Sequence, residues 1–321
     1  MPNFDPGRVR VQLTCENARV SIVQISSERP DVAMVLRGRT ADQALQSVPL
    51  LFALCGQAQA RAARLAYAAA RGEEYLPEID PNVQREVLRE HAWRCLLDLP
   101  PLLGEPALQQ EFISALKYLA DGNRDELRAL LTRPDIAKLR LLLTQTDALP
   151  FPASRLLPIL DAKNSLTEWP RLSAEFSRLP TWHEQAAETG AIARQAQKNA
   201  NLTSHLSARW QARFDELMEW ATGNEQIGAG GTVSATPVES GIGRAVLETA
   251  RGLLMHEITL DGERIADYQI VAPTEWNFHP GGALSDHLLG QDAGNRAELQ
   301  QHVARAVAAL DPCVPWELQW A

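Results

Sequence analysis

Cysteine and histidine side chains are the residues of this 321-residue chain best suited to metal or nucleophilic chemistry. Of its seven histidines, only His279 and His287 form a close pair beside irregular backbone. These two imidazoles could hold zinc or iron, or could simply be solvated or hydrogen-bonded. The motifs G-x-S-x-G, H-E-x-x-H and C-x-x-C are absent, which excludes a zinc site built from paired cysteines. The four cysteines are Cys15, Cys55, Cys95 and Cys313.

Four short strings combine thiol, guanidinium and hydroxyl groups. Residues 54–62 read L-C-G-Q-A-Q-A-R-A, and residues 248–256 read E-T-A-R-G-L-L-M-H. Residues 268–277 read Y-Q-I-V-A-P-T-E-W-N, and residues 311–315 read D-P-C-V-P. A thiolate is a soft ligand for metals, and a guanidinium donates hydrogen bonds to anions. Together the strings indicate a small metal-binding or anion-binding site.

These strings resemble, in the same order, the large subunit of nickel–iron hydrogenases. The corresponding family patterns are R-x-C-G-x-C-x-x-x-H, E-x-P-R-G-x-L-x-H, P-[ST]-x-W-N and D-P-C-x-x-C-x-x-H. In that family the first cysteine of each C-x-x-C pair binds nickel, and the second bridges nickel and iron. Cys55 and Cys313 match the two first cysteines, so the resemblance implies that half of the thiol ligands are retained.

The sequence departs from the family pattern where the bridging cysteines should stand, at Ala58 and Trp316. Neither a methyl group nor an indole can replace an anionic thiolate. We therefore expect no stable nickel–iron centre, no nickel and no hydrogen turnover. Other motif positions differ as well: Ala53, Ala62, Ala250 and Gln319.

A hydrogenase-like chain of about this length without bridging thiolates resembles the HupK/HoxV family of hydrogenase accessory proteins. Members are regarded as scaffolds on which the Fe(CN)2(CO) fragment is assembled or relayed. The resemblance implies a non-catalytic maturation factor for nickel–iron hydrogenase. It also implies three partners, namely HypC-type and HypD-type maturation proteins and the hydrogenase large-subunit precursor.

The same resemblance implies that Arg251, Pro273 and Thr274 surround the cyanide ligands of the iron, since bound cyanide accepts hydrogen bonds. We predict that Cys55 and Cys313 bind the iron as thiolates while Arg251 and Thr274 grip the cyanides. The iron and Arg251 are expected to keep the thiolate pKa near neutral. Two thiolate ligands in place of four would make binding transient and reversible.

Two other functions remain open from the sequence. The chain could be a metal-free interaction protein or chaperone that mimics the large subunit to bind maturation factors, with Cys55 as a small buried hydrophobe. It could also be an unusual metalloenzyme that uses His279 or His287 as replacement ligands. The second alternative is weaker, because imidazole cannot easily restore two bridging positions.

Short runs of alternating residues predict the strands that position these motifs. One hairpin is expected within residues 8–36, with a polar turn at Glu16-Asn17. A second is expected over residues 252–272, where Asp261-Gly262 suits the positive φ values of a type I′ turn.

Helical spacing dominates from Thr40 to about Gly223, with a kink or restart at Pro49. The longest predicted helix covers about residues 183–222 and carries a seam at Leu206, Trp210, Phe214 and Met218, and a final helix covers residues 295–310.

The expected fold is therefore α+β and mainly α, a reduced large-subunit-like helical bundle with short hairpins. We expect a single domain over residues 1–321. Its parts are a hairpin at 1–40, a helical body at 41–225, and a C-terminal hairpin and cysteine tail at 232–321.

Composition narrows the range of partners. Forty acidic and 31 basic residues give a net charge of −9, which argues against nucleic-acid binding. No run of 18 apolar residues occurs, so membrane insertion is not expected. Scattered cysteines and the lack of an export signal predict a cytoplasmic protein with reduced thiols.

Overall fold

The computed structural model describes residues 6–52, 54–146, 151, 155–198 and 205–321. The strands are β1 Arg8–Glu16, β2 Arg19–Glu28, β3 Tyr75–Ile79, β4 Thr232–Glu239, β5 Ile242–Thr249, β6 Gly252–Asp261, β7 Arg264–Val271 and β8 Trp316–Trp320. The longer helices are α1 Ala41–Leu51, α2 Gly56–Ala70, α3 Pro81–Trp93, α5 Gln109–Asp121, α6 Arg124–Leu131, α7 Pro134–Thr146, α10 Ala191–Lys198, α11 Leu206–Thr222 and α14 Arg296–Leu310. The short helical segments are η1 Val32–Leu36, η2 Arg94–Asp98, α4 Leu99–Leu102, α8 Asn164–Glu168, α9 Ala174–Arg178, α12 Pro273–Asn277 and α13 Ala283–Leu288.

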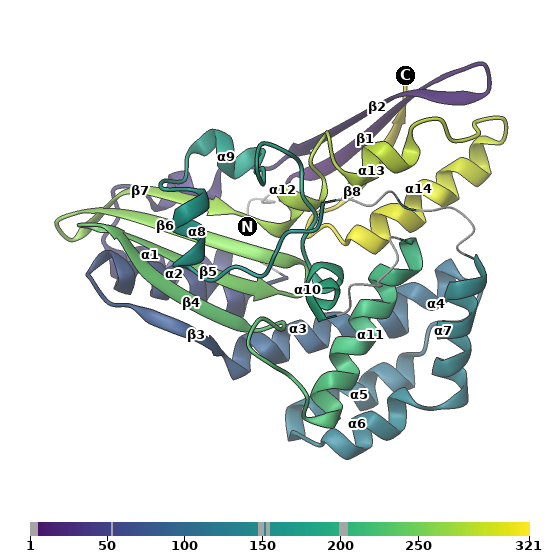
Figure 1. Cartoon of the computed structure of the whole chain (residues 1–321), viewed down its shortest axis with the longest axis horizontal. Coiled ribbons are helices and arrows are strands. Elements are labelled where there is room, and N and C mark those ends of the chain that lie inside the picture. Colours follow the sequence, from purple (N-terminus) through teal and green to yellow (C-terminus); the bar gives the residue numbers. More distant parts are fainter. Residues whose placement is uncertain (1–5, 53, 147–150, 152–154, 199–204) are drawn as a thin grey trace.

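A five-stranded antiparallel sheet runs through the molecule in the order β3-β4-β5-β6-β7. In Figure 1 its strands fan out on the left, and α4, α5, α6, α7 and α11 gather at the lower right. Neighbouring strand residues face opposite sides, so Leu254 packs under α2 while Leu253 and Met255 join the tryptophan-rich cluster of the other face. The sheet is therefore buried on both faces.

Helix α2 lies very close to the sheet because both surfaces are made of small residues. A Cβ atom on Gly243 of β5 would lie 2.0 Å from the backbone nitrogen of Ala70 and 2.3 Å from the carbonyl oxygen of Ala66. Alanines 62, 63, 66 and 69 of α2 are fully buried in this contact. This close packing fixes the N-terminus of α2, where Cys55 is the N-cap residue.

A three-stranded sheet in the order β2-β1-β8 joins the two ends of the chain. Strand β8 is parallel to β1, with Val9 opposite Trp316 and Leu13 opposite Trp320. Apolar residues of this sheet pack against α13 and α14. The pairing anchors the segment that follows Cys313 to the N-terminal hairpin.

The helices α3, α5, α6 and α11 form a separate packed layer. Within α11, Trp210 and Phe214 are buried, while Leu206 and Met218 are partly buried against the same cluster. The prediction that this stripe is a core seam is confirmed.

The predicted helix over residues 183–222 is wrong, because the structure has only α10 and α11 within it among the described residues. Residues 183 and 184 have positive φ values of 48° and 62°, and Gly190 has 111°. Such a backbone cannot continue a right-handed helix.

Both predicted hairpins are present, but their turns differ from the expectation. The second hairpin turns at Gly262 and Glu263, and of these two described residues only Gly262 has a positive φ, 59°. Asp261 ends strand β6, so the turn is not of type I′, which requires two positive φ values. The turn of the first hairpin instead has two residues with positive φ, Asn17 at 49° and Ala18 at 58°.

The α+β class is confirmed, whereas the prediction of a mainly helical bundle is not. Helices make up 49% of the described residues and strands 23%, with the main strands arranged in two sheets. The sequence reading missed β3, β4, β5 and β8. Because β5 is buried on both faces, it lacks the apolar–polar alternation that reveals a strand. Among the described helices, none combines the length and the apolar character needed to cross a membrane.

The close contact between α2 and β5 predicts that Gly243→Ala destabilises the fold. The added Cβ would overlap backbone atoms of α2, so the helix must shift, and we expect a loss of about 2 kcal/mol or more in the free energy of unfolding. The control is Gly281→Ala, whose Cβ would meet no atom nearer than 3.7 Å and should change stability by less than about 0.5 kcal/mol. Equal urea midpoints for the two variants would contradict this packing.

Candidate functional site

Four connections between elements meet at one small cavity. Cys55 precedes α2, Arg251 lies in the turn between β5 and β6, Pro273 begins α12, and Cys313 lies between α14 and β8. All four residues line a cavity of about 20 Å³, which we call the two-cysteine cavity. This volume suits roughly one water molecule. Segments more than 250 residues apart in the sequence therefore bring both predicted thiols to the same place.

Thr274 holds Cys313 in position. Its hydroxyl donates a hydrogen bond to the Cys313 sulfur at 3.0 Å and accepts one from the Cys313 backbone N–H at 3.2 Å. Thr274 is not among the described residues that line the two-cysteine cavity. The predicted hydrogen bond from this hydroxyl to cyanide would compete with its bond to Cys313, because the single hydroxyl proton already points to sulfur.

Arg251 is held by two buried carboxylates. Its Nη2 lies 3.1 Å from Oε2 of Glu90, and its Nε lies 3.3 Å from Oδ1 of Asp311. Nη1 makes no hydrogen bond with any described residue, so it remains available as a donor. Asp311 also binds Arg94 at 2.7 Å. The guanidinium is therefore fixed in place beside the thiols with one nitrogen unused.

The turn that carries Arg251 is set by close backbone contact. Gly252 has a φ of 128°, and a Cβ there would lie 2.3 Å from Cγ2 of Thr189 and 2.7 Å from the backbone nitrogen of Gly190. Asn277 donates a side-chain hydrogen bond of 3.1 Å to the carbonyl of Arg251. These contacts aim the arginine at the cavity although alanine, not proline, precedes it.

Burial makes Cys55 a neutral thiol. Desolvation and the neighbouring Cys313 raise the pKa of Cys55 to about 12, and this outweighs the lowering effect of Arg251. Glu86 also acts to raise the pKa of Cys55, while its carboxylate accepts the backbone N–H groups of Gln57 and Ala58 at 2.9 and 3.0 Å. Arg251 by itself therefore does not bring the pKa of Cys55 near neutral, and the near-neutral value expected with bound iron stays a prediction.

A buried chain of hydrogen bonds ends on Cys55. Gln59 donates to the Cys55 sulfur at 3.7 Å, and its amide oxygen lies 2.8 Å from Nε2 of His256. Nδ1 of His256 lies 2.7 Å from the hydroxyl of Tyr268. Burial lowers the pKa of His256 to about 3, so the ring is neutral. With the amide nitrogen on sulfur, Nε2 carries the proton and Tyr268 donates to Nδ1.

Comparison with known proteins finds hydrogenase-related sequences similar to this chain. A family model described as nickel-dependent hydrogenase matches residues 184–315. The HoxV hydrogenase expression/formation protein of Cupriavidus necator is 29% identical, with 92% of each chain covered. The HupK hydrogenase expression/formation protein of Azotobacter vinelandii is 29% identical, with 98% of each chain covered. Over nearly its whole length, this chain is therefore similar to the HoxV and HupK proteins.

Solved structures show that this chain shares the fold of hydrogenase large subunits. The [NiFeSe]-hydrogenase of Dm. baculatum superimposes with a TM-score of 0.57 at 14% identity, covering 93% of this chain and 94% of the other. The Ni-Fe-Se hydrogenase of D. vulgaris Hildenborough gives 0.54 at 16% identity, with the same coverage. At these identities the likeness concerns the fold alone.

In this chain the positions of the missing ligands serve packing. Ala58 and Ala62 are buried between α2 and the five-stranded sheet, where a larger side chain would separate the two. Trp316 and Gln319 belong to β8 and pair with Val9 and Gln12 of β1. The tail after Cys313 is thus a strand of the small sheet.

The remaining candidate ligands lie elsewhere. His279 lines a separate surface pocket, and His287 stacks on Phe151 and His302. Cys95 is buried among leucines of the helical layer, and Cys15 belongs to β1. Across the described residues, no group of three or more His, Cys, Asp or Glu side chains is arranged to hold a metal ion.

The sequence reading missed several residues that shape the site. Asp311 and His256 lie inside the quoted strings. Their motif positions were therefore a signal, but no role was assigned to them from the sequence. Gln59 also lies inside a quoted string, and its bond to the Cys55 sulfur appears only in the structure. Glu90 belongs to a helical stretch without a motif, and only the structure reveals it.

The pKa of Cys55 predicts slow alkylation in the folded protein. At pH 8 a pKa of about 12 leaves about one thiol in ten thousand ionised, so iodoacetamide should react about 1000-fold more slowly than with Cys55 of the urea-unfolded chain. Peptide mass spectrometry measures both rates, and the folded rate should rise about tenfold per pH unit. Equal rates in the two states at pH 8 would contradict the raised pKa of this partly buried thiol.

The neutral His256 predicts loss of stability in acid. Its folded pKa of about 3 lies below the ordinary value near 6.5, so only the unfolded chain takes up a proton as the pH falls between them. The free energy of unfolding should fall by about 1.4 kcal/mol per pH unit below pH 6.5 from this residue. Urea titrations should show a shallower slope for His256→Gln and an unchanged slope for His183→Asn, which alters an exposed histidine.

Proposed function

We propose that this chain is a non-catalytic maturation factor for nickel–iron hydrogenase that carries the Fe(CN)2(CO) fragment as transient cargo between Cys55 and Cys313. The names of the HoxV and HupK relatives as hydrogenase expression/formation proteins support the maturation role. The observation that carries the cargo role is the convergence of two thiols and one fixed guanidinium on a single cavity.

The donor set suits such a cargo. Two sulfurs are soft ligands for low-valent iron, and the unused Nη1 of Arg251 can donate a hydrogen bond to a cyanide nitrogen. Pro273 has no N–H and contributes an apolar wall. Thr274 acts as a positioning residue through Cys313, with the cyanide contact as a second use of its hydroxyl once Cys313 binds iron.

Loading would change the cavity in two ways. A volume of about 20 Å³ is smaller than an iron atom with three diatomic ligands, so the cavity must widen on loading. The Cys55 thiol must also lose its proton, because the thiolate is the ligand. Both requirements weaken binding, as expected of a carrier rather than of an enzyme with a resident metal centre.

The proposed partners follow from the same role. A HypC-type or HypD-type maturation protein would supply the fragment, and the hydrogenase large-subunit precursor would receive it. A metal-free interaction protein is the second candidate, favoured by the neutral state of Cys55 and the small cavity. Only the carrier function requires the thiols of Cys55 and Cys313.

Removal of either cysteine separates the two candidates. Protein purified anaerobically from cells with intact maturation genes should show infrared bands of cyanide and carbonyl, and Cys55→Ala and Cys313→Ala should each abolish them by removing one of two iron ligands. Cys15→Ala is the matched control, because Cys15 lies in β1 outside the cavity.

Hydrogenase activity in a strain that lacks the native gene is the second measurement. It should fall at least tenfold with either cavity variant at equal protein abundance and stay unchanged with Cys15→Ala. Full activity with both cavity variants, and partner capture that survives both changes, would support the metal-free alternative instead.

A further inference from the structure

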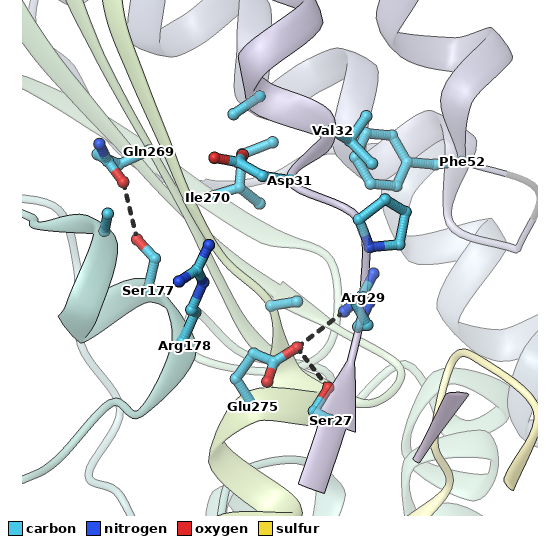
Figure 2. Close-up of a pocket in the computed structure, with 14 residues that line it drawn as sticks. Ser27, Arg29, Asp31, Val32, Phe52, Ser177, Arg178, Gln269, Ile270 and Glu275 are labelled. Carbon is cyan, nitrogen blue, oxygen red and sulfur yellow. Dashed lines mark hydrogen bonds and ion pairs between the residues drawn. The ribbon is translucent and has the colours of Figure 1, made fainter. Parts of the chain in front are cut away.

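A second, larger pocket lies next to the two-cysteine cavity. It has a volume of about 110 Å³ and is lined by residues from the end of β2, η1, α9, β7 and α12. Figure 2 shows the carboxylate of Glu275 with Arg29 on one side and Arg178 on the other. We call it the arginine pocket, after these two residues.

The arginine pocket adjoins the thiols. Ala272 lines both the pocket and the two-cysteine cavity. Glu275 in the pocket is the neighbour of Thr274, which holds Cys313. Although burial acts in the opposite direction, Cys313, Glu275 and Cys55 together raise the pKa of Arg29, so its guanidinium lies within electrostatic range of both sulfurs.

The pocket contains one guanidinium that is paired and one that is not. Arg29 lies 3.4 Å from Oε1 of Glu275, which also accepts a hydrogen bond of 3.1 Å from Ser27. Arg178 makes no hydrogen bond or ion pair with any described residue, although its charge acts on Glu275. An exposed arginine with no direct partner at the rim of a polar pocket is suited to meet an incoming acceptor.

We propose that the arginine pocket is the entrance through which small ligands reach Cys313, and that Arg178 makes it select ligands with anionic or hydrogen-bond-accepting outer atoms. Cyanide nitrogens on iron are of this class, so the inference deepens the proposed function and rests on it for the identity of the cargo. The proposal that ligands reach the thiols through this pocket does not depend on what the cargo is.

Charged thiol reagents test the route without iron. Anionic sulfonatoethyl and cationic trimethylammonioethyl methanethiosulfonates each transfer a thioalkyl group to a thiolate and release methanesulfinate. The measurement is the rate at Cys313 by peptide mass spectrometry, expressed as the anionic-to-cationic ratio relative to a free thiol. The ratio cancels any change in the thiolate fraction, because both reagents need the same ionised sulfur.

Arg178→Gln should lower this ratio about threefold, and Glu275→Gln should raise it by a similar factor, since they remove opposite charges from the same path. Arg39→Gln is the matched control, since it removes an equal charge from an exposed residue outside the pocket. An unchanged ratio in both pocket variants would overturn the selection by charge.

Ala174→Trp tests the path itself. Residue 174 is exposed on α9 and lines the pocket, so the indole can fill the space without disturbing the core. Both reagents should then modify Cys313 at least tenfold more slowly, at an unchanged urea midpoint. Modification of Cys313 at the wild-type rate in this variant would overturn the proposal that the pocket is the entrance. If Ala174→Trp slows modification but the wild-type protein shows no infrared bands of cyanide and carbonyl, the proposed entrance is supported and the iron cargo is rejected.

Discussion

The buried carboxylate of Asp311 is the contact on which the geometry of the two-cysteine cavity depends. It binds Arg94 at the end of α3 and Arg251 in the β5–β6 turn, and its φ of 55° turns the chain from α14 toward Cys313. Burial opposes its charge, but Arg251, Arg94 and Arg213 hold the pKa of Asp311 below its ordinary value. Breaking such a buried pair costs about 3–5 kcal/mol, so the three segments stay together.

The fold was predictable from the sequence where one face of an element meets water. The first hairpin and α14 have that character, and their spacing located them within a few residues. Strand β5 is buried on both faces and contains Arg244, whose charge is matched by Glu257, so no alternation was visible. Strand β8 did carry a signal, since Trp316, Leu318 and Trp320 alternate with polar residues.

The site residues were predictable from the sequence where a motif places a reactive or ligand-binding side chain in a connection between elements. Cys55, Arg251, Pro273 and Cys313 came from separate strings and line one cavity. Their surroundings were not predictable, because Glu90 and Arg29 lie outside the four strings and the contact of Gln59 with Cys55 depends on the fold. The high pKa of the Cys55 thiol was not predictable for the same reason, since desolvation depends on everything packed around the sulfur and not on one neighbouring arginine.

Desolvation also suggests how a carrier can release its cargo. In the structure Arg251 is already bound to Glu90 and Asp311, and a neutral Cys55 adds no further charge to the cavity. Ligation would place an additional negative sulfur in this dry environment. Once a partner competes for the iron, Cys55 regains a proton that it binds strongly, and this stabilises the empty state. Under the proposed function, the burial that keeps the thiol unreactive would therefore also favour handover.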